Sequence, residues 1–246
     1  MSSDFKDVEW GKPPETVKKD RNSLHPVDEA IFKEHPSPLW EAWMRIHPTH
    51  INHTTPHFGP MLYHIIRAMG CPYAIEIGVA QGYTSFFMAS AIRDNNVRYG
   101  CNGRYVAIDV MDKHYIFDPL IKEGFPIDVW TTNSLDVKKE QLASFPGGID
   151  LIFQDGWHNT KHCLKELELF YPYLKGDGNG YWIMHDVYSY CEEYYNIVMK
   201  DPRYKFESVR FLNNYGLAIC RKMEGYDYNK KFWPQGDQPE EQGFVA

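Results

Sequence analysis

Residues Tyr73–Ser85 read YAIEIGVAQGYTS and combine three local signals. An apolar run broken only by Glu76 predicts a strand, and Gly78 and Gly82 predict a tight turn that leads into a helical pattern. Glycine lets the backbone pass close to a ligand, and the first amides of a helix have no partner inside the helix. The Glu76 carboxylate accepts hydrogen bonds without donating any, so it favours a ligand with hydroxyl groups or an ammonium group. The segment therefore predicts a strand, a ligand-binding turn and a helix start.

The spacing of this turn is E-x-G-x-x-x-G, which differs from two common phosphate-binding patterns. A dinucleotide-binding turn requires G-x-G-x-x-G, and a P-loop ends in Gly-Lys-Ser or Gly-Lys-Thr. The turn instead resembles the first motif of the Rossmann-like methyltransferases that use S-adenosylmethionine (SAM). The resemblance implies that the methionine part of SAM binds here, with these cofactor-binding positions: Glu76, Gly78, Gly82, Thr84 and Ser85. An ordinary strand–helix turn without a cofactor is the alternative.

The composition limits the classes of function. The chain has 246 residues and a formal net charge of −7, which argues against an electrostatic grip on nucleic acid or on an anionic membrane. It contains neither an apolar run of about 18 residues nor the apolar core of a signal peptide near its start, so we expect a soluble, cytoplasmic protein. Its five cysteines are scattered and include no C-x-x-C pair. We therefore expect reduced structural thiols rather than a disulfide framework or a cysteine zinc site.

Changes in composition along the chain indicate three regions. Residues 1–59 combine a polar arm with a segment rich in proline, histidine and aromatic residues, which either forms a lid over a ligand or packs on the outside of the core. Residues 60–222 carry the strand and helix patterns, beginning with a helix at about residues 60–69. Residues 223–246 form a tail that wraps the surface or meets a partner chain, which leaves a homo-oligomer open.

Polar residues also follow the next two predicted strands. Arg104–Val110 is a short apolar strand that ends at Asp109, the position where nucleotide-binding α/β folds hold ribose hydroxyls. The third strand is followed by Asn133 and Ser134. The resemblance to SAM methyltransferases implies that one of these two side chains hydrogen-bonds the adenine base. Alternatively, Ser134 only caps a helix predicted over residues 135–145.

The following pair of strands carries the residues with the most reactive chemistry. Ile149–Gln154 is almost wholly apolar, as expected of a central strand buried on both faces, and Asp155 comes directly after it. The strand Gly180–Met184 is followed by His185 and Asp186. Neighbouring parallel strands place their carboxyl ends side by side, so we expect these side chains to converge at the cofactor cleft. Carboxylates, a neutral imidazole and water can bind a hard divalent cation such as Mg²⁺.

Residues 60–222 more specifically resemble the metal-assisted small-molecule O-methyltransferases. These include the catechol O-methyltransferase type and the related macrocin O-methyltransferase and cephalosporin-hydroxylase-like group. The resemblance implies that Asp155 and Asp186 bind Mg²⁺, and that His158 takes the proton of the substrate hydroxyl. His185 departs from the pattern, because the metal-dependent relatives usually have Asp or Glu there. A softer metal, a site completed by water or substrate, or no metal and a histidine base all stay open.

The last two predicted strands, 205–212 and 215–221, are joined by a very short turn and must be antiparallel. The expected fold is a Rossmann-like methyltransferase sandwich: a mostly parallel seven-stranded sheet with an antiparallel C-terminal hairpin and helices on both faces. The expected function is SAM-dependent methyl transfer to a hydroxyl of a small molecule, such as a sugar or a specialised metabolite, assisted by a divalent metal. A nonenzymatic SAM- or nucleoside-binding module and a metal-dependent hydrolase or hydroxylase are the alternatives.

Overall fold

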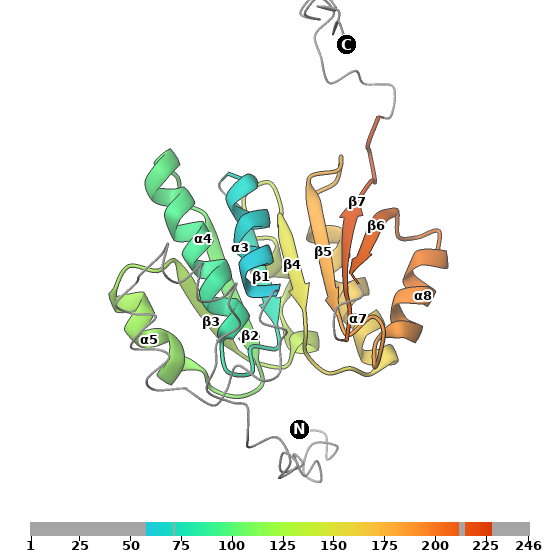
Figure 1. Cartoon of the computed structure of the whole chain (residues 1–246), viewed down its shortest axis with the longest axis horizontal. Helices are drawn as coiled ribbons and strands as arrows, with labels where there is room; N and C mark the ends of the chain where they lie inside the picture. The colour runs from blue at the N-terminus through green and yellow to red at the C-terminus, as the bar shows by residue number, and fades with distance from the viewer. Residues whose placement is uncertain (1–57, 71, 212–214, 228–246) are drawn as a thin grey trace, which may run out of the picture.

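A seven-stranded sheet forms the centre of the protein (Figure 1). The computed structural model describes residues 58–70, 72–211 and 215–227. The strands are β1 (Tyr73–Ile77), β2 (Arg104–Asp109), β3 (Ile127–Thr131), β4 (Leu151–Gln154), β5 (Gly180–His185), β6 (Phe206–Phe211) and β7 (Leu217–Lys222). Their order is β3-β2-β1-β4-β5-β7-β6, with β1 to β5 parallel and β7 antiparallel to both its neighbours. The predicted fold class is confirmed.

Helices cover both faces of this sheet and divide the core into two layers. One layer includes side chains of α3 (Phe58–Ala68), α4 (Tyr83–Tyr99) and α5 (His114–Lys122). The other includes side chains of α6 (Lys139–Leu142), α7 (Thr160–Phe170) and α8 (Glu192–Lys200). The 3₁₀ turn η3 (Ser134–Asp136) precedes α6, and η4 (Tyr171–Tyr173) follows α7. Figure 1 shows α3 and α4 side by side on one face of the sheet.

The central strands are apolar because both of their faces are buried. In β1, Ala74 packs in the first layer and its neighbour Ile75 in the second, and both side chains are fully buried. From β1 the chain proceeds outward to β2 and β3, then returns to β4 on the other side of β1. The carboxyl ends of β1 and β4 therefore flank the point where the strand order reverses. In open α/β sheets this point is the usual ligand site.

Three helices differ from what the sequence predicts. Helix α5 was not predicted, although a parallel β2–β3 pair requires a crossover between its strands. The single helix predicted over residues 135–145 is wrong, because Val137 and Lys138 are extended and separate η3 from α6. The extended backbone lets the Val137 side chain enter the second core layer. The sequence predicts a helix over residues 188–200, but α8 begins only at Glu192, since the amides of Ser189 and Cys191 both bond to the Asp186 carbonyl and form a turn.

The structure also bears on the expectations for the two ends of the chain, for the cysteines and for membrane-spanning helices. The predicted arm and lid at residues 1–59, apart from its last two residues, and most of the tail at 223–246 lie outside the described residues. Among the described cysteines, Cys163, Cys191 and Cys220 are free thiols, as expected. Cys101 is disulfide-bonded, which corrects the expectation of reduced thiols throughout. No helix in the described part of the chain is both long and apolar enough to cross a bilayer.

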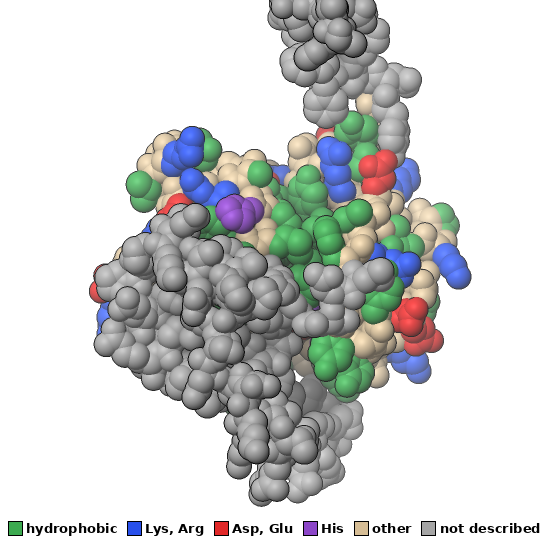
Figure 2. Space-filling model, in the orientation of Figure 1, with side chains coloured by type: hydrophobic (Ala, Val, Ile, Leu, Met, Phe, Trp, Pro, Cys, Tyr) green, Lys and Arg blue, Asp and Glu red, His purple; other side chains and the backbone are tan. Residues whose placement is uncertain are grey.

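The end of the sheet formed by β5, β7 and β6 has an apolar face. Figure 2 shows hydrophobic side chains gathered over these strands. Val209 and Ile219 are partners in register and share this face, and Val209 is 54% exposed. Among the described helices, α3 and α4 cover the neighbouring strands rather than this end.

Candidate active site

The glycine turn after β1 lies directly against the loop after β4. Gly78 and Gly82 have positive φ values of 85° and 80°. A Cβ atom on Gly78 would collide with the carbonyl oxygen of Asp155 and would lie 2.5 Å from the Cα of Gly156. Only glycine fits this position, because both the backbone conformation and the available space exclude a side chain. The predicted ligand-binding turn and the predicted metal ligand Asp155 are therefore adjacent in space.

We expect Gly78→Ala to lower the free energy of unfolding by on the order of 3 kcal/mol, through positive-φ strain plus the collision with the Asp155–Gly156 backbone. Gly70→Ala is a matched control, because Gly70 has a φ of 81° but no atom within 4 Å of an added Cβ. The control should cost about 1 kcal/mol. Urea unfolding of both variants measures the difference, and equal costs would show that the collision is relieved by movement of the loop.

Helix α4 begins directly after the turn. Its N-cap residue is Gly82, which provides no side-chain cap. The first-turn amides belong to Tyr83, Thr84 and Ser85, and a helix start of this kind favours an anionic group such as a carboxylate. The hydroxyls of Thr84 and Ser85 do not face the turn, because both donate to the Glu76 carboxylate.

Glu76 is fully buried and linked to neighbouring elements by hydroxyl groups. Thr84 and Ser85 of α4 and Tyr105 of β2 all donate to its two carboxylate oxygens. In the structure Glu76 ties the first turn of α4 to β1 and β2, and the predicted contact between Glu76 and a cofactor stays a prediction. Burial raises the pKa of Glu76 to about 7, although the three hydroxyl donors oppose that rise.

A pKa raised on folding makes stability depend on pH. The protonated form of Glu76 is favoured in the folded state, so its contribution is fully present below about pH 4.5 and is lost as the pH rises through about 7. The pKa change corresponds to about 3 kcal/mol. We expect Glu76→Gln to remove this part of the pH dependence of unfolding between pH 5 and 8, measured by urea titration. Glu123→Gln, at an exposed carboxylate, is the control, and an unchanged slope in Glu76→Gln would contradict the assignment.

Asp109 lies at the carboxyl end of β2, next to the glycine turn. Its carboxylate accepts hydrogen bonds from the backbone amides of Val79 at 3.0 Å and Met111 at 2.9 Å. Lys113 was not singled out from the sequence. Its ammonium group lies 3.5 Å from Asp109 and donates to the Ala80 carbonyl at 2.7 Å. The position predicted to hold ribose hydroxyls is thus fixed relative to the turn.

The two candidates after β3 have different surroundings. The Asn133 side chain caps η3 by accepting from the Leu135 amide at 2.9 Å. The Ser134 hydroxyl is buried and donates to Glu166, and it lies 3.2 Å from Nε2 of His162. The cap is therefore Asn133 rather than Ser134. A hydrogen bond from Ser134 to a base stays a prediction.

Asp155, His158, His185 and Asp186 form one cluster at the carboxyl ends of β4 and β5. One potential ligand atom from each residue lies within 4.8 Å of the others. Nε2 of His158 is 2.8 Å from one Asp186 oxygen and 3.4 Å from Asp155. His185 and Asp186 are buried, whereas the His158 side chain is 33% exposed. The convergence expected from neighbouring parallel strands is present in the structure.

His185 has an unusual environment for a buried histidine. Its Nδ1 lies 3.0 Å from Asp155 and 3.3 Å from Asp186, but neither ring nitrogen has a partner with hydrogen-bond geometry. The edge-on rings of Phe58 and Phe153, with centroids 5.5 and 6.3 Å away, hold the imidazole in place. A buried polar atom directed at two carboxylates without hydrogen-bonding them fits a position for a cation.

The charges of the cluster are strongly coupled. Burial lowers the pKa of His158 and of His185, but the nearby carboxylates of Asp155 and Asp186 outweigh it and raise each pKa to about 10. Burial raises the pKa of Asp186, yet the two histidines hold it well below its usual range. Asp186 also has a φ of 60°, a left-handed conformation that Asp tolerates better than most residues. Such strain often occurs at functional sites.

Aromatic side chains near the cluster were not predicted from the sequence. The Tyr190 ring stacks on His158 with centroids 5.6 Å apart and planes 8° apart. Tyr215 lies 6.3 Å from Tyr190, and Trp157 follows Asp155 and Gly156 in the loop. Tyr190, Tyr215 and Trp157 are 66, 52 and 56% exposed. The sequence signals for this group are the tyrosines that follow Asp186 and the tryptophan two positions after Asp155.

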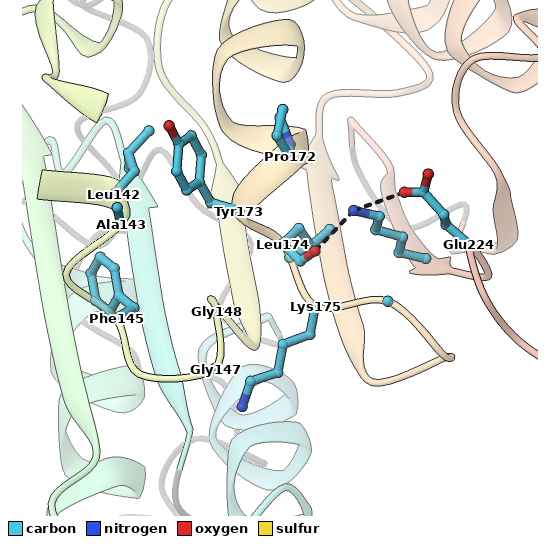
Figure 3. A pocket seen from close by; sticks show the side chains of 12 residues that line it. Leu142, Ala143, Phe145, Gly147, Gly148, Pro172, Tyr173, Leu174, Lys175 and Glu224 are labelled. Atoms are coloured by element: carbon cyan, nitrogen blue, oxygen red, sulfur yellow. Dashed lines mark hydrogen bonds and ion pairs between the residues drawn. The ribbon is translucent and has the colours of Figure 1, made fainter. Parts of the chain in front are cut away.

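A cavity of about 460 Å³ lies elsewhere, at the amino ends of β4 and β5 (Figure 3). Figure 3 shows Leu142, Phe145 and Tyr173 on one side and Lys175 and Glu224 on the other. The cavity is at the opposite edge of the sheet from Asp155 and Asp186, because its lining residues precede β4 and β5 in the chain or lie at and after the end of β7. It therefore does not contribute to the cluster.

Comparisons with known proteins agree with this arrangement. Residues 75–187 match a family model described as a methyltransferase domain. The O-methyltransferase of Bacillus cereus, in complex with S-adenosylhomocysteine (SAH), has a TM-score of 0.58 and 18% identity, over 80% of this chain and 96% of that chain. The SAH-bound methyltransferase PaMTH1 of Podospora anserina has a TM-score of 0.58 and 15% identity, over 81% and 98% of the two chains.

A third similar structure is the O-methyltransferase TomG of Streptomyces achromogenes, involved in tomaymycin synthesis and solved in complex with SAM. Its TM-score is 0.57 with 15% identity, over 83% of this chain and 99% of that chain. No curated protein is significantly similar in sequence. At these identities the structural likeness establishes the fold alone, and the family model matches less than half of the chain. The chain therefore has the fold of these O-methyltransferases, and its residues 75–187 are similar to a methyltransferase domain.

Proposed function

We propose that this protein transfers the methyl group of SAM to a hydroxyl of a small molecule, such as a sugar or a specialised metabolite, with the help of a divalent cation. The observation that carries the proposal is the position of the cluster beside the glycine turn. Asp155 supplies both a carboxylate to the cluster and the carbonyl against which Gly78 packs. A cofactor bound at the turn would lie next to the group that holds the acceptor.

The residues around the turn suit SAM better than a phosphate-bearing cofactor. The first amides of α4 suit the methionine carboxylate, and the Asp109 carboxylate suits the ribose hydroxyls. Glu76 would act through Thr84 and Ser85, because it holds the first turn of α4 in place. Ser134 is retained as a residue near the adenine.

The cluster fits a divalent cation, with Asp155, His185 and Asp186 as its ligands. His185 supports this assignment, since its buried Nδ1 faces both carboxylates and has no hydrogen bond. A bound cation would position the acceptor hydroxyl and make its proton easier to remove. His158 is the proposed base. Its Nε2 lies at the solvent-accessible side of the cluster, and it must first lose the proton that the two carboxylates stabilise in the present form.

The exposed rings of Tyr190, Tyr215 and Trp157 suit an acceptor with a flat apolar face, because aromatic rings stack on sugars and on other rings. Methyl transfer from a sulfonium is an in-line displacement, so the protein mainly aligns the two reactants and excludes water. A small-molecule acceptor and a homo-oligomer stay proposals. A cytoplasmic location is a prediction of the sequence, and the disulfide at Cys101 weighs against it.

Calorimetric titration of the full chain with SAM and SAH, each with and without Mg²⁺ or Mn²⁺, tests the proposal. We expect saturable binding of both nucleosides to one site, and metal-dependent methyl transfer to a hydroxylated acceptor. Binding of SAM without transfer to any hydroxylated compound would favour a nonenzymatic SAM-binding module. Binding of a metal without binding of SAM or SAH would favour a hydrolase or hydroxylase on this fold, and would contradict the proposal.

A further inference from the structure

The four residues of the cluster form an unusual ligand set for Mg²⁺. Two are carboxylates, Asp155 and Asp186, and two are imidazoles, His158 and His185. Mg²⁺ requires near-octahedral oxygen coordination and is bound through carboxylates, phosphates and water. Imidazole nitrogen is instead a good ligand for first-row transition ions such as Zn²⁺, Fe²⁺ and Ni²⁺. The two imidazoles therefore favour a transition ion over Mg²⁺ at this site.

His185 is the residue that makes the set selective. It is only 3% exposed, and its ring makes edge-on contacts with the rings of Phe58 and Phe153. A rotation that removed Nδ1 from the cluster would have to displace these packed rings. Asp or Glu at this position would give an oxygen ligand, but His185 offers only nitrogen at the buried side of the cluster.

An ordinary buried ion pair explains the same residues less well. A protonated His185 that served only to neutralise Asp155 and Asp186 should donate a hydrogen bond to one of them, because an unsatisfied buried donor costs about 1–3 kcal/mol. The distances of 3.0 and 3.3 Å would allow such a bond, but the geometry does not provide it. The imidazole instead faces a point shared with the two carboxylates, as ligands around one ion do.

We propose that the cluster selects a first-row transition ion of the Mn²⁺ to Zn²⁺ series over Mg²⁺, with Nδ1 of His185 as the ligand that sets the preference. This inference rests on the proposed function, because it concerns the cation of the same site. It extends that function by naming a specificity-determining residue in this chain. Asp155 and Asp186 complete the buried ligands, and His158 lies at the exposed side.

The test measures the affinities of the full chain for Co²⁺ and for Mg²⁺ by calorimetry, together with the visible absorption of bound Co²⁺. Wild-type protein is expected to bind Co²⁺ more tightly than Mg²⁺ and to give a Co²⁺ spectrum with nitrogen ligation. His185→Asp replaces the nitrogen ligand by an oxygen ligand. We expect the ratio of Co²⁺ affinity to Mg²⁺ affinity to fall at least ~10-fold in this variant.

Two further variants keep the test interpretable. His185→Asn is nearer in size to histidine, and it should lose Co²⁺ affinity without gaining Mg²⁺ affinity. His114→Gln is the matched control, because His114 pairs with Asp118 at 2.9 Å on the exposed surface of α5 and should leave both affinities unchanged. Thermal melting of each variant shows whether it folds. If His185→Asp does not fold, the wild-type affinities and His185→Asn decide the question.

The outcomes separate this inference from the proposed function. An unchanged affinity ratio in His185→Asp, or equal affinities of wild-type protein for Co²⁺ and Mg²⁺, would overturn the inference. SAH titration of the same samples tests the proposed function independently. SAH binding without a preference for Co²⁺ over Mg²⁺ would contradict only the proposed selectivity of the cation site. Failure of SAH to bind would contradict the proposed function.

Discussion

Asp186→Asn is expected to reduce divalent-cation affinity and the kcat of methyl transfer by about 100-fold or more, while SAH affinity changes less than about twofold. The Asp186 carboxylate lies 2.8 Å from His158 and 3.3 Å from His185, so it is central to the cluster. Its main chain has a φ of 60°, and Asn tolerates this conformation as well as Asp does. The substitution should therefore remove charge without unfolding the loop.

Calorimetry with Mn²⁺, SAH titration and a transfer assay on the same protein measure these three quantities. Asp118→Asn, at a surface carboxylate that pairs only with His114 among the contacts described for it, is the matched control. An Asp186→Asn protein with wild-type cation affinity would exclude Asp186 from the ligand set. A loss of SAH binding of the same size as the loss of transfer would instead indicate that the substitution damages the cofactor site.

His158→Gln is expected to lower kcat by about 10²–10⁴-fold with little change in SAH affinity, because glutamine can hydrogen-bond to Asp186 but cannot accept a proton. The pH profile distinguishes a base from a structural residue. If His158 takes the proton of the acceptor, wild-type transfer rises with pH as the imidazole becomes neutral, and the variant loses that rise.

His114→Gln controls for the loss of a histidine that pairs with a carboxylate. A His158→Gln enzyme that keeps the wild-type pH profile, whatever its rate, would show that another group removes the proton. His158 also stacks on Tyr190. If His158 served only to hold that contact, its loss should leave the shape of the pH profile of methyl transfer unchanged.

The strands could be predicted well because their physical signals are local. The sequence predicts strands over Tyr73–Ile77 and Ile127–Thr131, and β1 and β3 have these bounds, since a short apolar run between glycine-rich or polar loops has few alternative structures. The broken segment around Val137 could not be predicted. The helix is interrupted where burial of the Val137 side chain stabilises the fold more than a continuous helix would. That balance depends on the second core layer, which is formed by residues distant in the sequence.

The candidate site was predicted as a set of positions rather than as a set of contacts. Parallel strand order is sufficient to bring Asp155, His185 and Asp186 together. The hydrogen bond from Tyr105 to Glu76 could not be predicted in this way, because Tyr105 belongs to another strand. The orientation of His185 depends on Phe58 and Phe153, which no sequence spacing connects to it.

The most direct test of the central claim, that the glycine turn and the acidic cluster form one methyl-transfer site, is a crystal structure of the full chain with SAH and Mn²⁺. The predicted result places the amino-acid end of SAH at the start of α4, its ribose on Asp109, and an anomalous Mn²⁺ peak between Asp155, His185 and Asp186, with the sulfur facing the ion. SAH bound away from Gly78–Gly82, or Mn²⁺ bound away from the cluster, would contradict the claim.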